Sequence, residues 1–309
     1  MRSIFAIVIC MFYSSLLLFG QEDTVFVGKH TVTLSEVIIN NKINVPYFID
    51  RIKNDTSFYK AFRNLHIVGY TSLNDIRMLD RKGRVDASLQ SKTRQKVVNG
   101  CRMMDVLEES TQGDIYNDDS TYNYYTAQMY ASLFFTKGKV CGETNIVSGR
   151  NFTTQGKSGM DKHKEQLKML FFNPGKRISG LPFMSNKTAI YDDDIAEAYD
   201  MALDMDEYNK VSCYVLTQKV KPGYEGQVVV DEMKTWFDDK TYEVVARNYS
   251  LSYDAGVYDF KVNMEVQMTH IGDLLVPSLL RYNGNWKVIF KKRERGVFTA
   301  TLFDFIKNP

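Results

Sequence analysis

The sequence predicts a β-dominated α+β protein, in which a curled antiparallel meander (a half-barrel) is covered by helices from the N-terminal half. Three observations favour this fold class. Apolar and polar residues alternate over 258–268, short turns separate extended runs between 199 and 305, and apolar residues recur at helical spacing over 44–62. Connections this short require neighbouring strands to be antiparallel, and the apolar face that results needs a cover.

The N-terminus has the features of a secretory signal peptide. Arg2 precedes an apolar run over 4–19, and the small residue Gly20 follows it. We therefore expect a signal peptide at 1–20 and a protein that is periplasmic, associated with an outer membrane, or extracellular. The run is nearly as long as the ~20 apolar residues of a membrane span, so an uncleaved anchor stays open. No later segment is long and apolar enough to form such a helix.

Length and charge set further bounds. Once the signal is removed, about 290 of the 309 residues remain, enough for one large domain. We expect a single domain over 21–309, with strands and helices over 21–150, a loop and lid helices over 151–198, and the meander over 199–305. The formal net charge of +2 falls to +1 without Arg2. A chain so near neutral gives no reason to expect nucleic acid as a partner.

The first elements after the signal are short strands and then helix. The β-branched runs 24–28 and 31–39 are typical of strands. Asn44 and Pro46 suit the start of a helix, and the helical spacing continues to 62. We expect a break in this helical segment near Asp55.

Strands and a second helical region complete the N-terminal half. Two or three strands are predicted from 65 to about 107, with turns at 82–83 and 99–100. The aromatic segment 122–135 favours a helix. A loop is expected over 148–158, and a helix that begins at Ser158 and ends at the Asn-Pro-Gly of 173–175.

The C-terminal half is predicted as the meander. Its turns are expected at 238–240, 254–256, 271–273 and 283–285. The alternating strand at 258–268 presents one apolar face, which we take as the candidate site for an apolar ligand. That face consists of Tyr258, Phe260, Val262, Met264, Val266 and Met268. As an ordinary half-buried sheet face, the same residues are core under the helices; as an incompletely filled concavity, they would accept an acyl chain.

A basic cluster follows near the C-terminus. On an extended strand its members share one face, which suits lipid head groups or an acidic partner, although such runs are usually solvated. The cluster consists of Lys287, Lys291, Arg293 and Arg295.

No catalytic or metal-binding motif is present. The sequence lacks a G-x-S-x-G elbow, a Walker loop and a Rossmann fingerprint, and none of its four histidines lies in H-E-x-x-H. The acidic run 192–194 lacks the later Gly and Glu of a calcium loop. We therefore expect a non-enzymatic protein without cofactor or metal, while a catalytic site assembled from distant residues stays open.

Three cysteines follow the signal peptide: Cys101, Cys141 and Cys213. An odd number permits at most one bridge, the sequence does not fix the pairing, and no pair has C-x-x-C spacing. We interpret these cysteines as small buried hydrophobic residues.

Three stretches resemble an uncharacterised family of secreted proteins from bacteria of the Bacteroidetes kind. They are FYKAFRNL at 58–65, KHKEQLKMLFFNPG at 162–175 and FKKRERGVFTATLFDF at 290–305. The likeness covers most of the mature chain and agrees with export, but it implies no activity.

The C-terminal half is also loosely similar to lipoprotein-sorting carriers of the LolA and LolB type. The similarity rests on the order of SCYVL at 212–216, KTWFDDKTYEVV at 234–245 and LVP at 275–277. It implies a curled half-barrel whose cavity holds acyl chains, and hence lipid or lipoprotein as the partner. The alternative is an envelope interaction or assembly protein with a fully packed core, which would have a protein partner and no small ligand.

Overall fold

The computed structural model describes residues 23–41, 43–147, 169–178, 184, 186–256, 258–288 and 292–307. The expected signal peptide at 1–20 and the expected loop at 148–158 lie outside the described residues. The helix expected from Ser158 lies there too, except for 169–172, which are helical.

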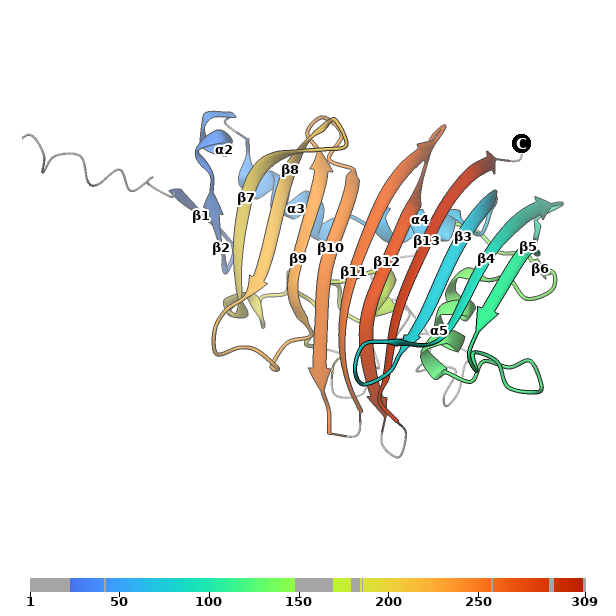
Figure 1. Ribbon diagram of the computed structural model, residues 1–309. Helices are drawn as coiled ribbons and strands as arrows, with labels where there is room; N and C mark the ends of the chain where they lie inside the picture. The colour runs from blue at the N-terminus through green and yellow to red at the C-terminus, as the bar shows by residue number, and fades with distance from the viewer. Residues whose placement is uncertain are drawn as a thin grey trace, which may run out of the picture.

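Thirteen strands form one sheet in the order β1-β2-β7-β8-β9-β10-β11-β12-β13-β3-β4-β5-β6 (Figure 1). The N-terminal strands are β1 (Asp23–Val27), β2 (His30–Leu34), β3 (Val68–Leu79), β4 (Val85–Val98), β5 (Cys101–Gln112) and β6 (Val140–Cys141). The C-terminal strands are β7 (Tyr199–Tyr208), β8 (Val211–Val220), β9 (Val230–Asp238), β10 (Val244–Asp254), β11 (Tyr258–Ile271), β12 (Leu274–Val288) and β13 (Glu294–Lys307). The predicted β-dominated, curled antiparallel sheet is confirmed.

Strands β7 to β13 form the meander, and two further pairings join the N-terminal strands to it. Strand β13 pairs antiparallel with β3, from Arg295 opposite Leu79 to Lys307 opposite Val68. At the other end, β2 pairs with β7 in parallel. The first and last thirds of the chain therefore lie within the same sheet.

Helices cover one face of this sheet, which we call the inner face; Figure 1 shows them behind the strands. They are α2 (Glu36–Asn41), α3 (Val45–Asn54), α4 (Ser57–Asn64) and α5 (Tyr125–Phe134), and a 3-10 turn, η1 (Ala196–Ala198), precedes β7. The predicted helix start is confirmed, since Asn44 accepts a hydrogen bond from the Tyr47 amide and Pro46 lies in the first turn. The predicted break is confirmed too, because α3 ends before Asp55. The helix expected at 122–135 is α5.

Two expected elements are wrong. The predicted strand 31–39 ends at Leu34, because α2 begins at Glu36, whose carboxylate suits the positive end of a helix. The turn predicted at 283–285 lies inside β12. A Cβ on Gly284 would lie 2.5 Å from the Tyr282 hydroxyl and 2.9 Å from Val262, so this glycine makes room for packing rather than for a turn.

The interpretation of the cysteines as unbridged hydrophobic residues is wrong for two of them. Cys101 lies opposite Cys141 in the β5–β6 pairing, and the two form a disulfide. Cys213 is a free thiol on β8 and is fully buried.

Candidate functional site

The predicted apolar face of β11 points to the inner side of the sheet. Phe260, Val262, Met264 and Val266 are buried, while Tyr258 and Met268 are half-buried. Residues 169–172 lie over this part of the sheet, since the ring of Phe171 packs against those of Tyr282 and Trp286, with centroids 5.8 and 6.2 Å away. The Tyr249 hydroxyl also donates a hydrogen bond to the Phe171 carbonyl oxygen.

A small apolar cavity remains between this cover and the sheet. Its volume is about 20 Å³, and Met264 of the predicted ligand-binding residues lines it. The full lining is Met129, Tyr130, Leu133, Phe134, Phe171, Phe172, Met264, Leu280, Tyr282 and Phe298. A space of this size holds about one water molecule. The floor of the sheet is therefore mostly filled by the protein's own side chains.

A larger cavity, which we call the α4–α5 cleft, adjoins the small one within the cover. Its volume is about 280 Å³. Its lining residues are Tyr59, Phe62, Arg63, Leu65, His66, Tyr70, Arg102, Ser132, Leu133, Phe134, Glu143, Met169 and Phe172. Leu133, Phe134 and Phe172 line both cavities. These three side chains separate the cleft from the apolar floor beneath it.

One side of the α4–α5 cleft is aromatic. Phe62 of α4 stacks on Phe172 with ring centroids 4.2 Å apart, and Phe134 of α5 meets Phe172 edge-on at 6.0 Å. Phe58 and Phe62 are four residues apart on α4, so both rings project from the same side of that helix. The side chains of Phe62 and Phe134 are buried, and Phe172 is half-buried.

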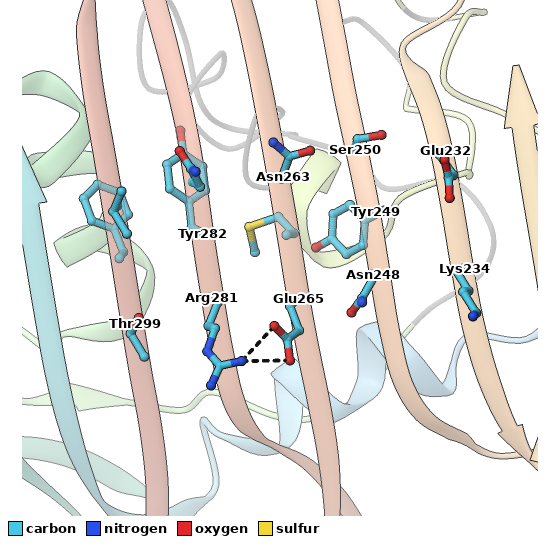
Figure 2. Close-up of a pocket in the computed structure, with 14 residues that line it drawn as sticks. Glu232, Lys234, Asn248, Tyr249, Ser250, Asn263, Glu265, Arg281, Tyr282 and Thr299 are labelled. Carbon is cyan, nitrogen blue, oxygen red and sulfur yellow. Dashed lines mark hydrogen bonds and ion pairs between the residues drawn. The ribbon is translucent and has the colours of Figure 1, made fainter. Parts of the chain in front are cut away.

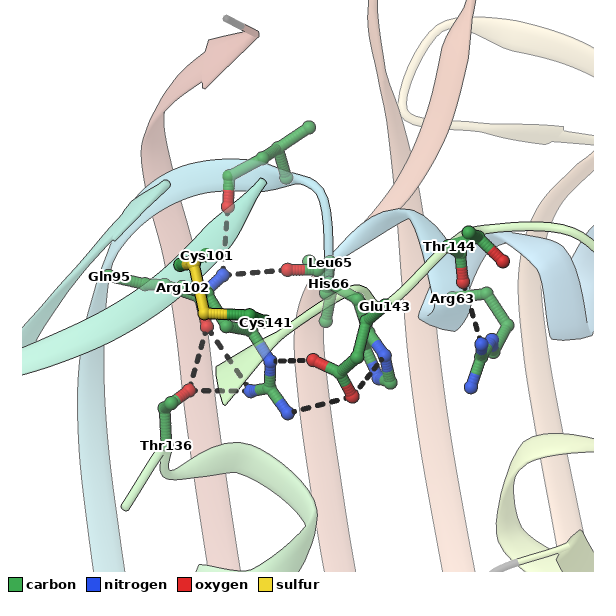
Figure 3. A network of polar contacts seen from close by, with 11 residues as sticks. Arg63, Leu65, His66, Gln95, Cys101, Arg102, Thr136, Cys141, Glu143 and Thr144 are labelled. Carbon is green, nitrogen blue, oxygen red and sulfur yellow. Dashed lines mark hydrogen bonds and ion pairs between the residues drawn. A yellow bond between two sulfur atoms is a disulfide. The ribbon is translucent and has the colours of Figure 1, made fainter. Parts of the chain in front are cut away.

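The other side of the cleft carries a group of ionisable side chains, shown in Figure 3. The Arg102 guanidinium donates to Glu143 from Nε and, at 3.3 Å, from Nη2. The Nδ1 atom of His66 lies 3.1 Å from Oε1 of the same Glu143 carboxylate. Arg63 donates to the Thr144 carbonyl oxygen at 2.6 Å. Because two hydrogen bonds join the Arg102 guanidinium to the Glu143 carboxylate, both side chains are fixed in orientation.

Buried polar groups and the disulfide hold this group in place. Arg102 also donates to Thr136 Oγ1 at 2.5 Å, and Thr136 donates to Gln95 Oε1 at 2.9 Å. The Gln95 amide nitrogen donates to the carbonyl oxygens of Leu65 and Val68, at 2.7 and 2.8 Å. The disulfide joins the residue before Arg102 to the residue two before Glu143. The polar side of the cleft is therefore preorganised.

Glu143 is ionised in this environment. Partial burial raises its pKa, but the hydrogen bond from Arg102 and the charges of His66, Arg102 and Arg63 outweigh burial. The pKa of Glu143 consequently lies below its ordinary value of 4.5.

The opposite, outer face of the sheet carries a groove of about 530 Å³ across β9 to β13. Figure 2 shows its polar side chains in rows on neighbouring strands. Those labelled on the outer face are Glu232, Lys234, Asn248, Ser250, Asn263, Glu265, Arg281 and Thr299. Arg281 donates to both oxygens of Glu265, at 3.1 and 2.9 Å. We favour the cleft as the site, because ligand sites combine an apolar enclosure with a few convergent polar groups.

The predicted basic residues do not share one strand. Lys287 lies on β12, Arg293 precedes β13 and Arg295 lies on it, whereas Lys291 falls outside the described residues. The hairpin of β12 and β13 nevertheless brings Lys287, Arg293 and Arg295 to one cavity, described below.

Sequence reasoning missed the polar side of the cleft. His66 is one of four histidines that lie in no recognised motif, and no sequence pattern singles out Arg63, Arg102 or Glu143. The positions of Arg102 and Glu143 close behind two cysteines are a signal, but only once Cys101 and Cys141 are known to be bridged.

No group of three or more His, Cys, Asp or Glu side chains among the described residues is placed to hold a metal ion. No helix in the described part of the chain has the length and apolar character needed to cross a membrane. The acidic run 192–194 instead pairs with Arg177, at 2.6 Å to Asp192 and 3.1 Å to Asp194.

No family model matches the chain, and no curated protein matches it. Among solved structures it is similar to a DUF1329 family protein from Desulfovibrio piger, with 13% identity, 81% of this chain and 92% of that chain covered, and a TM-score of 0.25. It is also similar to a putative outer membrane lipoprotein-sorting protein domain from Vibrio parahaemolyticus, with 9% identity, coverage of 81% and 91%, and a TM-score of 0.26. Both TM-scores are low, so neither fold nor function is inferred from these two proteins.

Proposed function

We propose that this protein is an exported, non-enzymatic carrier that binds the acyl chain of a lipid or lipoprotein in the α4–α5 cleft. The observation that carries the proposal is the composition of the cleft. The cleft of about 280 Å³ has aromatic and aliphatic side chains on one side and a fixed set of charged side chains on the other, and polar atoms form the larger part of its wall. An amphiphile with a carboxyl, ester or amide end matches both sides.

The volume of the cleft limits the length of acyl chain that it can hold and the free energy gained on binding. Ligand pockets usually span ~300–1,000 Å³, so the cleft takes part of an acyl chain rather than a whole lipid. Each buried methylene contributes about 0.8 kcal/mol, and about six of them contribute about 5 kcal/mol before the costs of association. Phe172 and Leu133 separate the cleft from the apolar floor at Met264. Rotation of these side chains would extend the site to the predicted face of β11.

The proposal is tested first on the wild-type protein. Native mass spectrometry after mild purification, followed by lipid extraction, should show a bound amphiphile, and a fluorescent fatty acid should bind with micromolar affinity. A protein that carries no lipid and ignores the fatty acid would contradict the proposal. That outcome favours the alternative, an envelope interaction or assembly protein with a packed core.

A filling substitution locates the site. Leu133→Trp places an indole in the cleft and should weaken fatty-acid binding at least tenfold, because the chain and the ring compete for one volume. Leu73→Trp is the matched control, since Leu73 lies on the outer face of β3 and is 48% exposed. Equal affinities for both variants in a fluorescence titration would place the ligand elsewhere.

A further inference from the structure

A cavity of about 710 Å³ lies at one end of the sheet, far along the strands from the disulfide. We call it the hairpin cavity, because the β3–β4 hairpin and the adjoining ends of β12 and β13 form its sides and the residues before α5 close it. Its lining is Met78, Leu79, Asp80, Arg81, Asp86, Asn123, Tyr124, Lys287, Lys292, Arg293, Glu294 and Arg295. It shares no residue with the lining of the α4–α5 cleft.

The carboxylates of the hairpin cavity are engaged within the protein. Asp80 pairs with Arg84 at 2.7 Å and accepts hydrogen bonds from the amides of Lys82 and Arg84. These backbone and side-chain hydrogen bonds lower the pKa of Asp80. Asp86 accepts a hydrogen bond from the Tyr124 hydroxyl at 3.2 Å.

Glu294 has a structural role at the start of α5. Its carboxylate accepts hydrogen bonds from the amides of Tyr125 and Thr126, at 3.0 and 2.7 Å, and from the Thr126 hydroxyl at 2.5 Å. The N-terminal amides of a helix lack partners within the helix, so this carboxylate satisfies them. Its carboxylate is therefore held by α5, and within the described residues Glu294 forms no ion pair with the lysines and arginines around it.

Most of the cations in the cavity, by contrast, have no carboxylate partner. Arg293 pairs with Asp259 at 2.6 Å and donates to Asn285 at 2.6 Å. In the part of the chain that the structure describes, Arg81, Lys287, Lys292 and Arg295 form no ion pair. Lys287 and Lys292 are exposed and Arg295 is half-buried, so all three side chains are accessible to solvent. The lining carries five cations against three carboxylates, and this excess of positive charge attracts anions.

We propose that the hairpin cavity binds a phosphate group, carried either by a lipid head group or by a free phosphate. Arginine offers paired donors that match phosphate oxygens, and lysine adds a compact positive charge. The cavity has both types, and its volume exceeds that of a single phosphate group. The site is independent of the acyl cleft, because the two share no residue.

The test compares two triple variants of the full chain. Lys287→Gln/Lys292→Gln/Arg295→Gln removes three charges from the cavity, and Arg94→Gln/Lys210→Gln/Lys219→Gln removes three exposed charges elsewhere. Calorimetric titration with inorganic pyrophosphate and co-sedimentation with phosphatidylglycerol vesicles are measured for each, with phosphatidylcholine vesicles as the neutral surface. Far-UV circular dichroism confirms that each variant is folded.

We expect the cavity variant to lose at least tenfold in affinity while the control variant keeps the affinity of the wild type. Loss of both pyrophosphate and vesicle binding supports a general phosphate site, whereas loss of vesicle binding alone supports a head group as the source. If the wild type binds neither probe, or if both variants lose affinity equally, the proposal is overturned.

Discussion

Arg247 lies on the inner face of β10, on the same side as the buried Tyr249 and Leu251, and is 6% exposed. Its Nε donates to Thr235 Oγ1 at 3.0 Å, and its guanidinium lies 4.2 Å from the centre of the Phe58 ring. Burial lowers the pKa of Arg247, although Tyr191 and Asp55 act in the opposite direction. The charge is thus kept in the interior by a hydrogen bond and an aromatic ring, at a cost in desolvation.

Two substitutions of Arg247 separate the contribution of its packing to stability from the contribution of its charge. Arg247→Ala should lower the free energy of unfolding by about 2–4 kcal/mol, because it leaves a cavity against Phe58. Arg247→Met fills most of that volume without a buried charge, and should change stability by less than about 1.5 kcal/mol. Urea denaturation of both variants measures the difference. If Met is as destabilising as Ala, the guanidinium contacts outweigh the desolvation cost.

The ionisation of Glu143 makes the stability of the fold depend on pH. Its pKa in the folded protein lies below 4.5, so its ionised form stabilises the fold above that pH and this contribution is lost as the pH falls through the folded pKa. Glu143→Gln should therefore be less stable than the wild type near neutral pH. The difference should shrink as the pH falls below 4.5 and through the folded pKa of Glu143.

Denaturation by urea at several pH values checks this dependence. Asp105→Asn is the matched control, since Asp105 is an exposed partner of Lys96 on the edge strand. A gap between Glu143→Gln and the wild type that persists unchanged in acid would contradict the assignment, because the lost stability would not depend on the carboxylate charge.

At the scale of elements, local sequence signals predicted most strands and helices. Turn residues and capping residues act over a few positions, and the α3–α4 break and three of the four turns in the meander were found from them. Asn283-Gly284-Asn285 has the composition of a turn, yet it lies within β12 because Tyr282 and Val262 occupy the space beside Gly284. Such packing depends on a neighbouring strand, so no local pattern reveals it.

Strand β5 carries charged side chains that discourage other strands from pairing with its edge. Strand β6 pairs with only Cys101 and Arg102 of β5, so among the described residues the outer edge of the strand beyond them has no partner strand. Asp105 and Glu108 along this edge pair with lysines of β4. Charged side chains discourage pairing with the edge strand of another molecule.

The Cys101–Cys141 disulfide ties the end of the sheet to the polar side of the cleft. Its partners are 40 residues apart, and closing a loop of that length in the unfolded chain corresponds to about 4 kcal/mol of stability in the chain-entropy model. Cys101→Ser/Cys141→Ser should lower the free energy of unfolding by about that amount. It should also weaken fatty-acid binding, because Glu143 follows the bridge by two residues.

Chemical denaturation and the fatty-acid titration measure these two effects on the same sample. Cys213→Ser serves as the comparison, since Cys213 is unbridged and distant in the sheet order. Stability and affinity that both remain at the wild-type level in the double variant would show that the bridge constrains neither the fold nor the cleft.

At the scale of the whole molecule, the arrangement of strands was not predictable from the sequence. The meander follows from short turns, but the antiparallel pairing of β13 with β3 joins segments more than 200 residues apart, and nothing local marks it. The same holds for the candidate site. Arg63 lies in the last turn of α4, His66 follows that helix, Arg102 lies on β5 and Glu143 follows β6, so their proximity depends on the completed sheet.

The pairing of β13 with β3 affects when the sheet can fold during synthesis of the chain. Strand β13 is synthesised more than 200 residues after β3, its partner on one side. Until then β3 to β5 form a detached three-stranded piece with an exposed edge, and the native sheet cannot close. Closure of the native sheet is thereby delayed until β13 has been synthesised.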